Sequence, residues 1–175
     1  MTGRANPLGV RIEPLGKHHD RSSFSCGEQD LDDWFRNRAS QDERRNVARV
    51  FVAIDRELGV VGFYTLSAFT LTPDEIPADI ARKLPRYSAI PAVLIGRLAR
   101  DEKARGQGIG ELLVIDAINR ALDAARSIAI FAIVVEAKND TAVHFYETLG
   151  FRRFPATQRR LFLPASEAAA GRQKS

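Results

Sequence analysis

The sequence has little of what a secreted, metal-binding or membrane protein needs. Among its 175 residues Cys26 is the only cysteine, which excludes an internal disulfide and is expected to be packed or idle rather than nucleophilic. No apolar run is long enough to cross a membrane and no secretory signal is visible, so a cytoplasmic location is the default expectation. His18, His19 and His144 show no metal-ligand spacing, and no metal is expected.

Acidic residues are outnumbered by basic ones, 22 to 26, which gives a formal net charge of +4 and a pI near 9.6. The basic residues gather in clusters: Arg44-Arg45, Arg82-Lys83-Arg86, Arg97-Arg100-Lys103-Arg105, Arg152-Arg153 and Arg159-Arg160. Solvated surface accounts for most clusters of this kind, but their sum favours a polyanionic partner, and a nucleic acid would use more of them than a small phosphorylated ligand. No recognised nucleic-acid motif is present, so the charge alone is a weak argument.

A glycine-rich turn, Arg105 to Gly110, organises the chain. Its alternate glycines allow positive φ, so that successive N–H groups converge where the apolar-periodic helix after it begins. The unpaired N–H groups and the helix dipole favour a pyrophosphate, and Arg105 can add a charged contact. A turn that merely starts a helix is the alternative, but the buried strand predicted over residues 92–99 favours a strand, phosphate loop and helix. Glu111 and Leu112 stand where a P-loop needs lysine and Ser/Thr, and Glu111 also excludes a dinucleotide fingerprint.

The hydrophobic content of 45% suits one globular domain over residues 1–164, followed by a flexible tail at 165–175. Periodicity and turn residues predict helices and strands in alternation. The predicted strands are 10–12, 50–54, 60–66, 92–100, 128–135, 151–154 and 159–163. The predicted helices are 28–42 after a capping box at Ser25, a short or irregular one after Thr72, one from Ile109 with Leu112, Leu113, Ala117, Ala121 and Leu122 on its apolar stripe, and 139–149 with Ala142, Phe145 and Leu149 inward.

The spacing Arg-x-x-Gly-x-Gly over Arg105, Gly108 and Gly110, with a strand before it and residues 139–151 after it, resembles the acetyl-coenzyme A loop of the GNAT N-acetyltransferases. This resemblance implies an α/β (α+β) fold, a mixed central sheet splayed between two parallel strands and flanked by helices, with acetyl-CoA as cosubstrate. A bulge at Gly96 would open the strand edge for a pantetheine arm. The residues expected at the cofactor are Leu98, Ala99, Arg100, Arg105, Gly106, Gln107, Gly108, Ile109, Gly110, Asn139 and Ala142.

The segment from Phe145 to Phe151 looks like the GNAT segment whose tyrosine protonates the departing thiolate, which makes Tyr146 the expected catalytic acid. By its position alone, a tyrosine packed on the core would be the commoner explanation. A tyrosine near pKa ~10 can donate to a thiolate whose conjugate acid lies near ~8.5, while backbone N–H groups near Leu98 and Ala99 hold the oxyanion. Glu136, Asp101 and His144 are candidate bases only by position, so an α-amine near pKa ~7.7 fits better than a lysine near ~10.4.

Residues 24–34, 62–64, 95–101 and 160–164 look like the toxin acetyltransferases of bacterial toxin–antitoxin pairs. The resemblance implies acetylation of the amino acid carried on charged tRNA, inhibition of translation, and silencing by a ribbon-helix-helix antitoxin. Arg97, Arg152 and Arg153 are the residues expected at the tRNA. Arg100 departs from the pattern, which has a small apolar residue there, so packing near the pantetheine should differ.

Two other functions stay open: a GNAT enzyme acting on a small amine or a protein N-terminus, and a CoA-binding regulatory module without catalysis. Tyr146 argues against the second, because a binding module has no use for a placed acid. The dispersed basic clusters argue, less firmly, against the first. A homodimer is one of the assemblies expected, and no membrane partner is expected.

Overall fold

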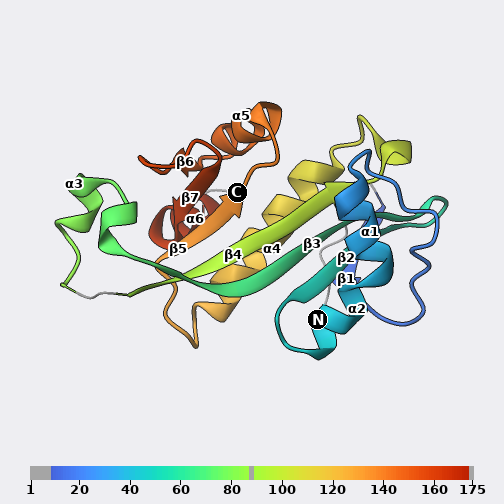
Figure 1. Ribbon diagram of the computed structural model, residues 1–175, viewed down its shortest axis with the longest axis horizontal. Helices are drawn as coiled ribbons and strands as arrows, with labels where there is room; N and C mark the ends of the chain where they lie inside the picture. Colours follow the sequence, from blue (N-terminus) through green and yellow to red (C-terminus); the bar gives the residue numbers. More distant parts are fainter. Residues whose placement is uncertain (1–8, 87–88, 174–175) are drawn as a thin grey trace. The chain divides into compact units, whose positions relative to one another are not determined.

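The computed structural model describes residues 9–86 and 89–173, and its strands form one mixed sheet in the order β1-β2-β3-β4-β5-β7-β6 (Figure 1). The strands are β1 Val10–Pro14, β2 Arg49–Asp55, β3 Gly59–Leu71, β4 Ile90–Arg100, β5 Ala132–Glu136, β6 Arg152–Arg153 and β7 Arg160–Pro164. The helices are α1 Gln29–Asn37, α2 Ala39–Arg44, α3 Ala78–Ala81, α4 Ile109–Ala124, α5 Asp140–Thr148 and α6 Ala165–Gln173, with 3-10 turns η1 Pro73–Glu75 and η2 Glu102–Ala104.

By its contacts the chain divides into two compact units. The first comprises residues 1–67 and 96–117, and the second comprises residues 68–95 and 118–175. Strands β3 and β4 and helix α4 each run through both. The single domain over 1–164 therefore stays a prediction.

In the first unit, β1, β2 and β3 form an antiparallel meander. The strands predicted over 50–54 and 60–66 are confirmed and form a hairpin: the Asp55 carboxylate accepts hydrogen bonds from the N–H groups of Glu57 and Leu58, at 2.8 and 3.0 Å, and Gly59 closes the turn at φ +76°. Helix α1 packs its aromatic side chains on β3, where the rings of Phe35 and Phe63 stack at 4.1 Å. This aromatic cluster is the core of the first unit.

The prediction of one continuous helix over 28–42 is wrong. The chain breaks at Arg38 (φ −122°, ψ −20°) into α1 and α2, because the Phe35 carbonyl at the end of α1 accepts a hydrogen bond from the Arg21 guanidinium at 2.5 Å. The predicted capping box at Ser25 is also absent: α1 begins after Glu28 without a side-chain cap.

In the second unit, β4 and β5 pair in parallel over four residues, from Ala92↔Ala132 to Ile95↔Val135. The ladder ends one residue before Gly96, although β4 continues to Arg100, which fits the predicted opening of this strand pair. Strand β5 starts at Ala132 rather than at residue 128, because the turn after α4 continues through Ile128, whose N–H bonds to the Ala124 carbonyl. The prediction took Ile128 as part of a buried apolar strand, but its side chain is 70% exposed.

The helix predicted over 139–149 is confirmed as α5: the Asn139 side chain caps it by accepting a hydrogen bond from the Ala142 N–H at 2.8 Å, and Gly150 follows at φ +98°. Its buried side chains are Val143 and Tyr146, whereas Ala142 and the other residues predicted to face inward are half-buried.

Two further expectations concern peripheral segments. The segment after Thr72 is short and irregular as predicted, with a capping box from Thr72 to Glu75 and a break before α3. Residues 165–173 of the segment expected to be a flexible tail form helix α6, in which Glu167 pairs with Arg152 and Arg172 pairs with Asp123. Among residues 9–86 and 89–173, no helix combines the length and apolar character that a membrane crossing requires.

Candidate active site

The glycine loop lies between η2 and α4 in the first unit. Gly106 and Gly108 take the positive φ values that their lack of a side chain permits, +79° and +73°. Gly108 accepts the first hydrogen bond of α4, from the Leu112 N–H at 3.1 Å, so the N–H groups just after it have no intrahelical acceptor. Residues 105–108 are exposed while Ile109 is buried. The exposed loop therefore lies at the N-terminus of α4, where free backbone N–H groups are suited to bind phosphate.

Asp101 links the start of this loop to the N-terminal segment by hydrogen bonds. Its carboxylate is 3% exposed and accepts hydrogen bonds from the N–H groups of Ser25 at 3.1 Å and Lys103 at 2.9 Å. The Ser25 carbonyl in turn accepts one from the Glu102 N–H at 2.9 Å. Asp101 therefore holds the N-terminal segment against the glycine loop, and its oxygens are already occupied. Of the other two bases suggested by position, Glu136 pairs with Arg160 at 2.8 Å and His144 is exposed on α5.

Gly62, which the sequence analysis used only as part of a motif, allows α4 to approach β3. A Cβ at this position would lie 2.9 Å from Leu113 Cδ1 and 3.1 Å from both the Ala99 carbonyl oxygen and Ile109 Cγ2. Real Cβ atoms rarely come so close to backbone. Gly62 therefore allows the close packing of α4, the helix whose N-terminus would bind phosphate.

The predicted cofactor residues on β4 differ in environment. Ala99 is buried with the aromatic cluster, whereas Leu98 and Arg100 are half-buried. Arg97 is half-buried too, and its guanidinium stacks on Trp34 at 4.2 Å from the ring centroid. Burial lowers the pKa of Arg97, while the nearby Asp42 charge opposes that shift.

Tyr146 lies on the buried face of α5 in the second unit. It is 6% exposed, and its ring contacts Phe145 and Phe151 at centroid distances of 5.4 and 5.6 Å. Its hydroxyl has no hydrogen-bond partner among residues 9–86 and 89–173, which is uncommon for a buried polar group and typical of functional sites. Burial raises the pKa of Tyr146 to about 12, so the phenol keeps its proton at neutral pH.

The other predicted residues of the second unit lie on α5 and β6. Asn139 and the half-buried Ala142 form the capped start of α5. Arg152 and Arg153 are exposed, but each already pairs with a carboxylate, Arg152 with Glu167 and Arg153 with Glu147 at 3.0 Å. A phosphate would have to compete with these two partners.

A cluster that the sequence analysis missed joins Glu13, His18 and His19, whose ligand atoms lie within 4.8 Å of one another. The Gly16 N–H donates to His19 Nδ1 at 2.9 Å, so the neutral ring carries its proton on Nε2 and donates it to Glu13 at 2.6 Å. A metal would need the lone pair of Nε2. The cluster is therefore a hydrogen-bonded turn.

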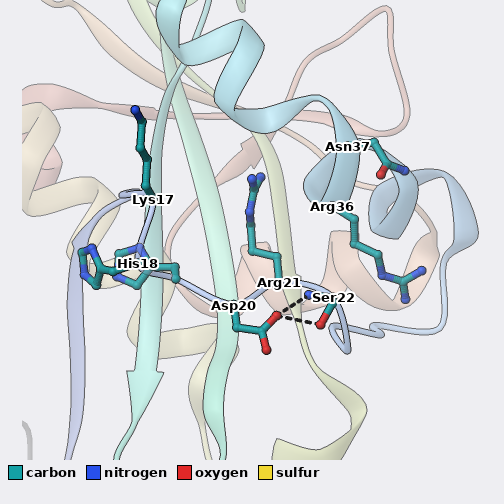
Figure 2. Close-up of a pocket in the computed structure, with 8 residues that line it drawn as sticks. Lys17, His18, Asp20, Arg21, Ser22, Arg36 and Asn37 are labelled. Carbon is teal, nitrogen blue, oxygen red and sulfur yellow. Dashed lines mark hydrogen bonds between the residues drawn. The ribbon is translucent and has the colours of Figure 1, made fainter.

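A cavity of about 610 Å³ lies beside this turn and is lined by residues 17–22, Arg36 and Asn37 (Figure 2). In Figure 2 the side chains of Lys17 and Arg21 extend to one side of the loop, while Asp20 turns to the other and bonds to Ser22. None of the predicted site residues lines this cavity.

The strand, glycine loop and helix, together with the capped helix that carries a buried phenol, have the features expected of an acyltransferase. A family model described as an acetyltransferase (GNAT) domain matches residues 46–153. The chain therefore belongs to the GNAT acetyltransferase family.

Two relatives match most of the chain. A tRNA-acetylating toxin from Mycobacterium tuberculosis is 38% identical over 151 residues, which cover 86% of this chain and 89% of the relative. A Sinorhizobium fredii protein named "Probable toxin TacT" is 31% identical over 172 residues, with 93% of each chain covered.

Three solved structures are similar as well. AtaT complexed with acetyl-methionyl-tRNAfMet has a TM-score of 0.85 at 29% identity, covering 95% of this chain and 99% of that one. AtaTR bound with AcCoA has a TM-score of 0.80 at 30% identity, with 93% and 97% covered. A tyrosine-to-phenylalanine mutant of AtaT bound to the C-terminus of the antitoxin AtaR has a TM-score of 0.78 at 28% identity, again with 93% and 97% covered.

Proposed function

We propose that this protein is an acetyl-CoA-dependent N-acetyltransferase toxin that acetylates the α-amino group of aminoacyl-tRNA and thereby blocks translation. The observation that carries the catalytic part is Tyr146, a buried phenol whose hydroxyl has no partner among the described residues. The substrate part is supported by the 38% identical relative, which is named for tRNA acetylation, and by the structure of AtaT with an acetylated aminoacyl-tRNA.

Acetyl-CoA supplies the activated acetyl group as a thioester. Its pyrophosphate would be held by Arg105 and by backbone N–H groups of the glycine loop, in which Gly106 and Gly108 have positive φ. Asn139 and Ala142, at the start of α5, are further proposed cofactor residues. The similar AtaTR structure bound with AcCoA supports this choice of cosubstrate.

Tyr146 would deliver a proton to the sulfur as the amine attacks. The pKa of Tyr146 is about 12, well above the pKa of ~8.5 of the thiol that would form. Complete transfer of the tyrosine's proton to the thiolate is therefore unfavourable. The attacking nitrogen must lose a proton as well, and an α-ammonium near pKa ~7.7 is more acidic than the thiol. Net transfer from nitrogen to sulfur is therefore downhill by about 1 kcal/mol, and Tyr146 has only to relay the proton.

The remaining parts of the proposal concern the developing charge and the base. Backbone N–H groups near Leu98 and Ala99 would stabilise the oxyanion. Because Asp101 and Glu136 already have partners, neither offers a free carboxylate as base. An α-amine, partly neutral near pH 7, needs no strong base, which favours an aminoacyl ester over a lysine side chain as acceptor.

The proposal extends to partners. Arg97, Arg152 and Arg153 would contact the tRNA, whose presence implies a cytoplasmic site of action. A cognate antitoxin of the ribbon-helix-helix type would silence the enzyme, in line with the similar AtaT structure bound to the C-terminus of AtaR. We also propose a homodimer, as the sequence analysis expected.

Labelled acetyl-CoA incubated with the protein and a pool of charged total tRNA tests the function. We expect label on the amino acid of at least one aminoacyl-tRNA, arrest of translation when the free protein is present, and relief by the antitoxin. Label only on proteins or on small amines would overturn the proposal and favour a GNAT enzyme with another acceptor.

A further inference from the structure

Arg97 is held rigidly at both ends. Its backbone N–H donates to the hydroxyl of Thr65 at 3.0 Å, and Thr65 is only 3% exposed. Its guanidinium carbon lies over the Trp34 ring at 4.2 Å from the centroid, within the range of a cation–π contact. Trp34 is itself fixed, because its indole N–H donates to Asp42 at 2.8 Å and its ring stacks on Phe63.

The edge of this guanidinium has no acceptor in the part of the chain that the structure describes. No residue in the described ranges 9–86 and 89–173 accepts a hydrogen bond from it, although stacking on Trp34 leaves all its N–H donors available. Two of the other half-buried arginines of the first unit have acceptors: Arg21 donates to the Phe35 carbonyl and the Ser40 hydroxyl, and Arg36 donates to the Phe24 carbonyl. Arg100, the remaining one, has no acceptor among residues 9–86 and 89–173, but it is not stacked on a ring as Arg97 is. A partly desolvated guanidinium that is oriented and unpaired is suited to a ligand with a planar pair of oxygens.

Arg97 directly precedes Leu98 and Ala99, the residues proposed to hold the oxyanion. The acceptor amine must reach this point of β4. In an aminoacyl-tRNA the amino acid's carboxyl is esterified and uncharged, so the nearest anion to the reactive amine is the phosphodiester on the 5′ side of the terminal nucleotide.

Resting on the proposed function, we infer that Arg97 binds this terminal phosphodiester through its free edge, and that Trp34 and Asp42 are positioning residues that hold the guanidinium. Charge-assisted hydrogen bonds of this kind stabilise a complex enough for an effect of about 10- to 100-fold. Arg97 would thus distinguish a nucleotide-linked amine from a free one.

The test uses two acceptors that differ only in this phosphate: a 3′-aminoacylamino-3′-deoxyadenosine and its 5′-phosphate. For the wild type, kcat/KM should be about 10- to 100-fold higher with the phosphorylated acceptor. In Arg97→Ala the ratio should fall toward one, and in Arg97→Lys it should be intermediate, because an ammonium lacks the planar fork. The KM for aminoacyl-tRNA should rise in Arg97→Ala, whereas calorimetry should show unchanged affinity for acetyl-CoA.

Positioning by Trp34 has its own readout. Trp34→Leu should lower the phosphate preference and Trp34→Phe should restore most of it, because only an aromatic ring supports the stacked guanidinium. Arg56→Ala, which removes an exposed arginine of the β2–β3 turn, should leave the preference unchanged.

The inference is wrong if Arg97→Ala keeps the wild-type phosphate preference, or if it leaves the KM for aminoacyl-tRNA unchanged. It is also wrong if free amino acids are acetylated in an Arg97-dependent manner, since the ligand would then be a carboxylate. Failure of the wild type to acetylate any aminoacyl-tRNA is a different result, which overturns the proposed function itself.

Discussion

Replacing Tyr146 with phenylalanine should change activity and stability in opposite directions. The exchange removes one hydroxyl from a side chain that is 6% exposed and keeps the ring contacts with Phe145 and Phe151. We expect turnover to fall about 100-fold, the lower end for loss of a general acid, which corresponds to about 2.7 kcal/mol in the activation barrier.

Stability should not fall with activity. The hydroxyl has no hydrogen-bond partner in the part of the chain that the structure describes, so its removal abolishes an unsatisfied buried polar group. The free energy of unfolding should be unchanged or higher by about 1 kcal/mol, and Tm should rise by at most about 2–4 °C. Tyr64→Phe is the matched control: its hydroxyl donates to Asp116 at 2.6 Å, so that exchange should destabilise the protein by about 1.5–3 kcal/mol.

The raised pKa of Tyr146 gives this prediction a pH dependence. Burial raises the pKa from the ordinary 10.0 to about 12 in the native state. Between these values the unfolded chain has released the proton and the native state still holds it, so the wild type's stability contribution from Tyr146 is present below pH 10 and lost as pH rises to 12. Tyr146→Phe cannot show this loss, and its advantage in stability should grow over that range.

Single-turnover kinetics with saturating acetyl-CoA and urea unfolding at pH 8 and pH 11 measure these effects. Turnover within about twofold of the wild type, with chemistry limiting the rate, would assign the proton to water or to another residue. A loss of more than about 1 kcal/mol in stability would mean that the hydroxyl makes a native hydrogen bond. Either result refutes the reasoning.

The remaining predictions concern the glycine loop, its helix and the tRNA. Gly108→Val should abolish most acetyl-CoA affinity measured by calorimetry, because a β-branched residue disfavours φ +73° and blocks close approach of the pyrophosphate; an unchanged Kd in the folded variant would refute this placement of the cofactor. Gly62→Ala should lower the free energy of unfolding by about 1–3 kcal/mol in urea, because the new methyl meets Leu113 and backbone, and a neutral result would show that α4 can shift freely. The dependence of log K for tRNA on log salt should have a slope near ~0.7–0.9 per phosphate engaged. Exchanging Arg152 and Arg153 for alanine should reduce that slope, and an unchanged slope would show that their carboxylate partners keep them from the tRNA.

The sequence by itself determined the parts of this protein that depend on local backbone chemistry. The strand, glycine loop and helix from β4 to α4 were predictable because positive φ requires glycine and because apolar periodicity identifies a helix over several turns. Helix α5 was predictable for the same reason, since Asn139 caps its start and Gly150 ends it. Family resemblance then pointed to Tyr146.

The tertiary structure alone decided what depends on partners distant in the chain. The break at Arg38 follows from Arg21 reaching the Phe35 carbonyl, and helix α6 forms ion pairs with Arg152 and Asp123 that no local pattern predicts. Asp101 looked like a candidate base and is instead occupied by the N–H groups of Ser25 and Lys103, which no spacing rule reveals.

The chemistry of single groups was decided in the same way. Burial, a property of the assembled fold, raises the pKa of Tyr146, and its hydroxyl has no partner among the residues that the structure describes. Trp34, which the sequence analysis gave no separate role, lies under the Arg97 guanidinium because β4 and α1 meet in the first unit. Local pattern therefore determines which elements form, whereas long-range packing determines which of their side chains remain free for chemistry.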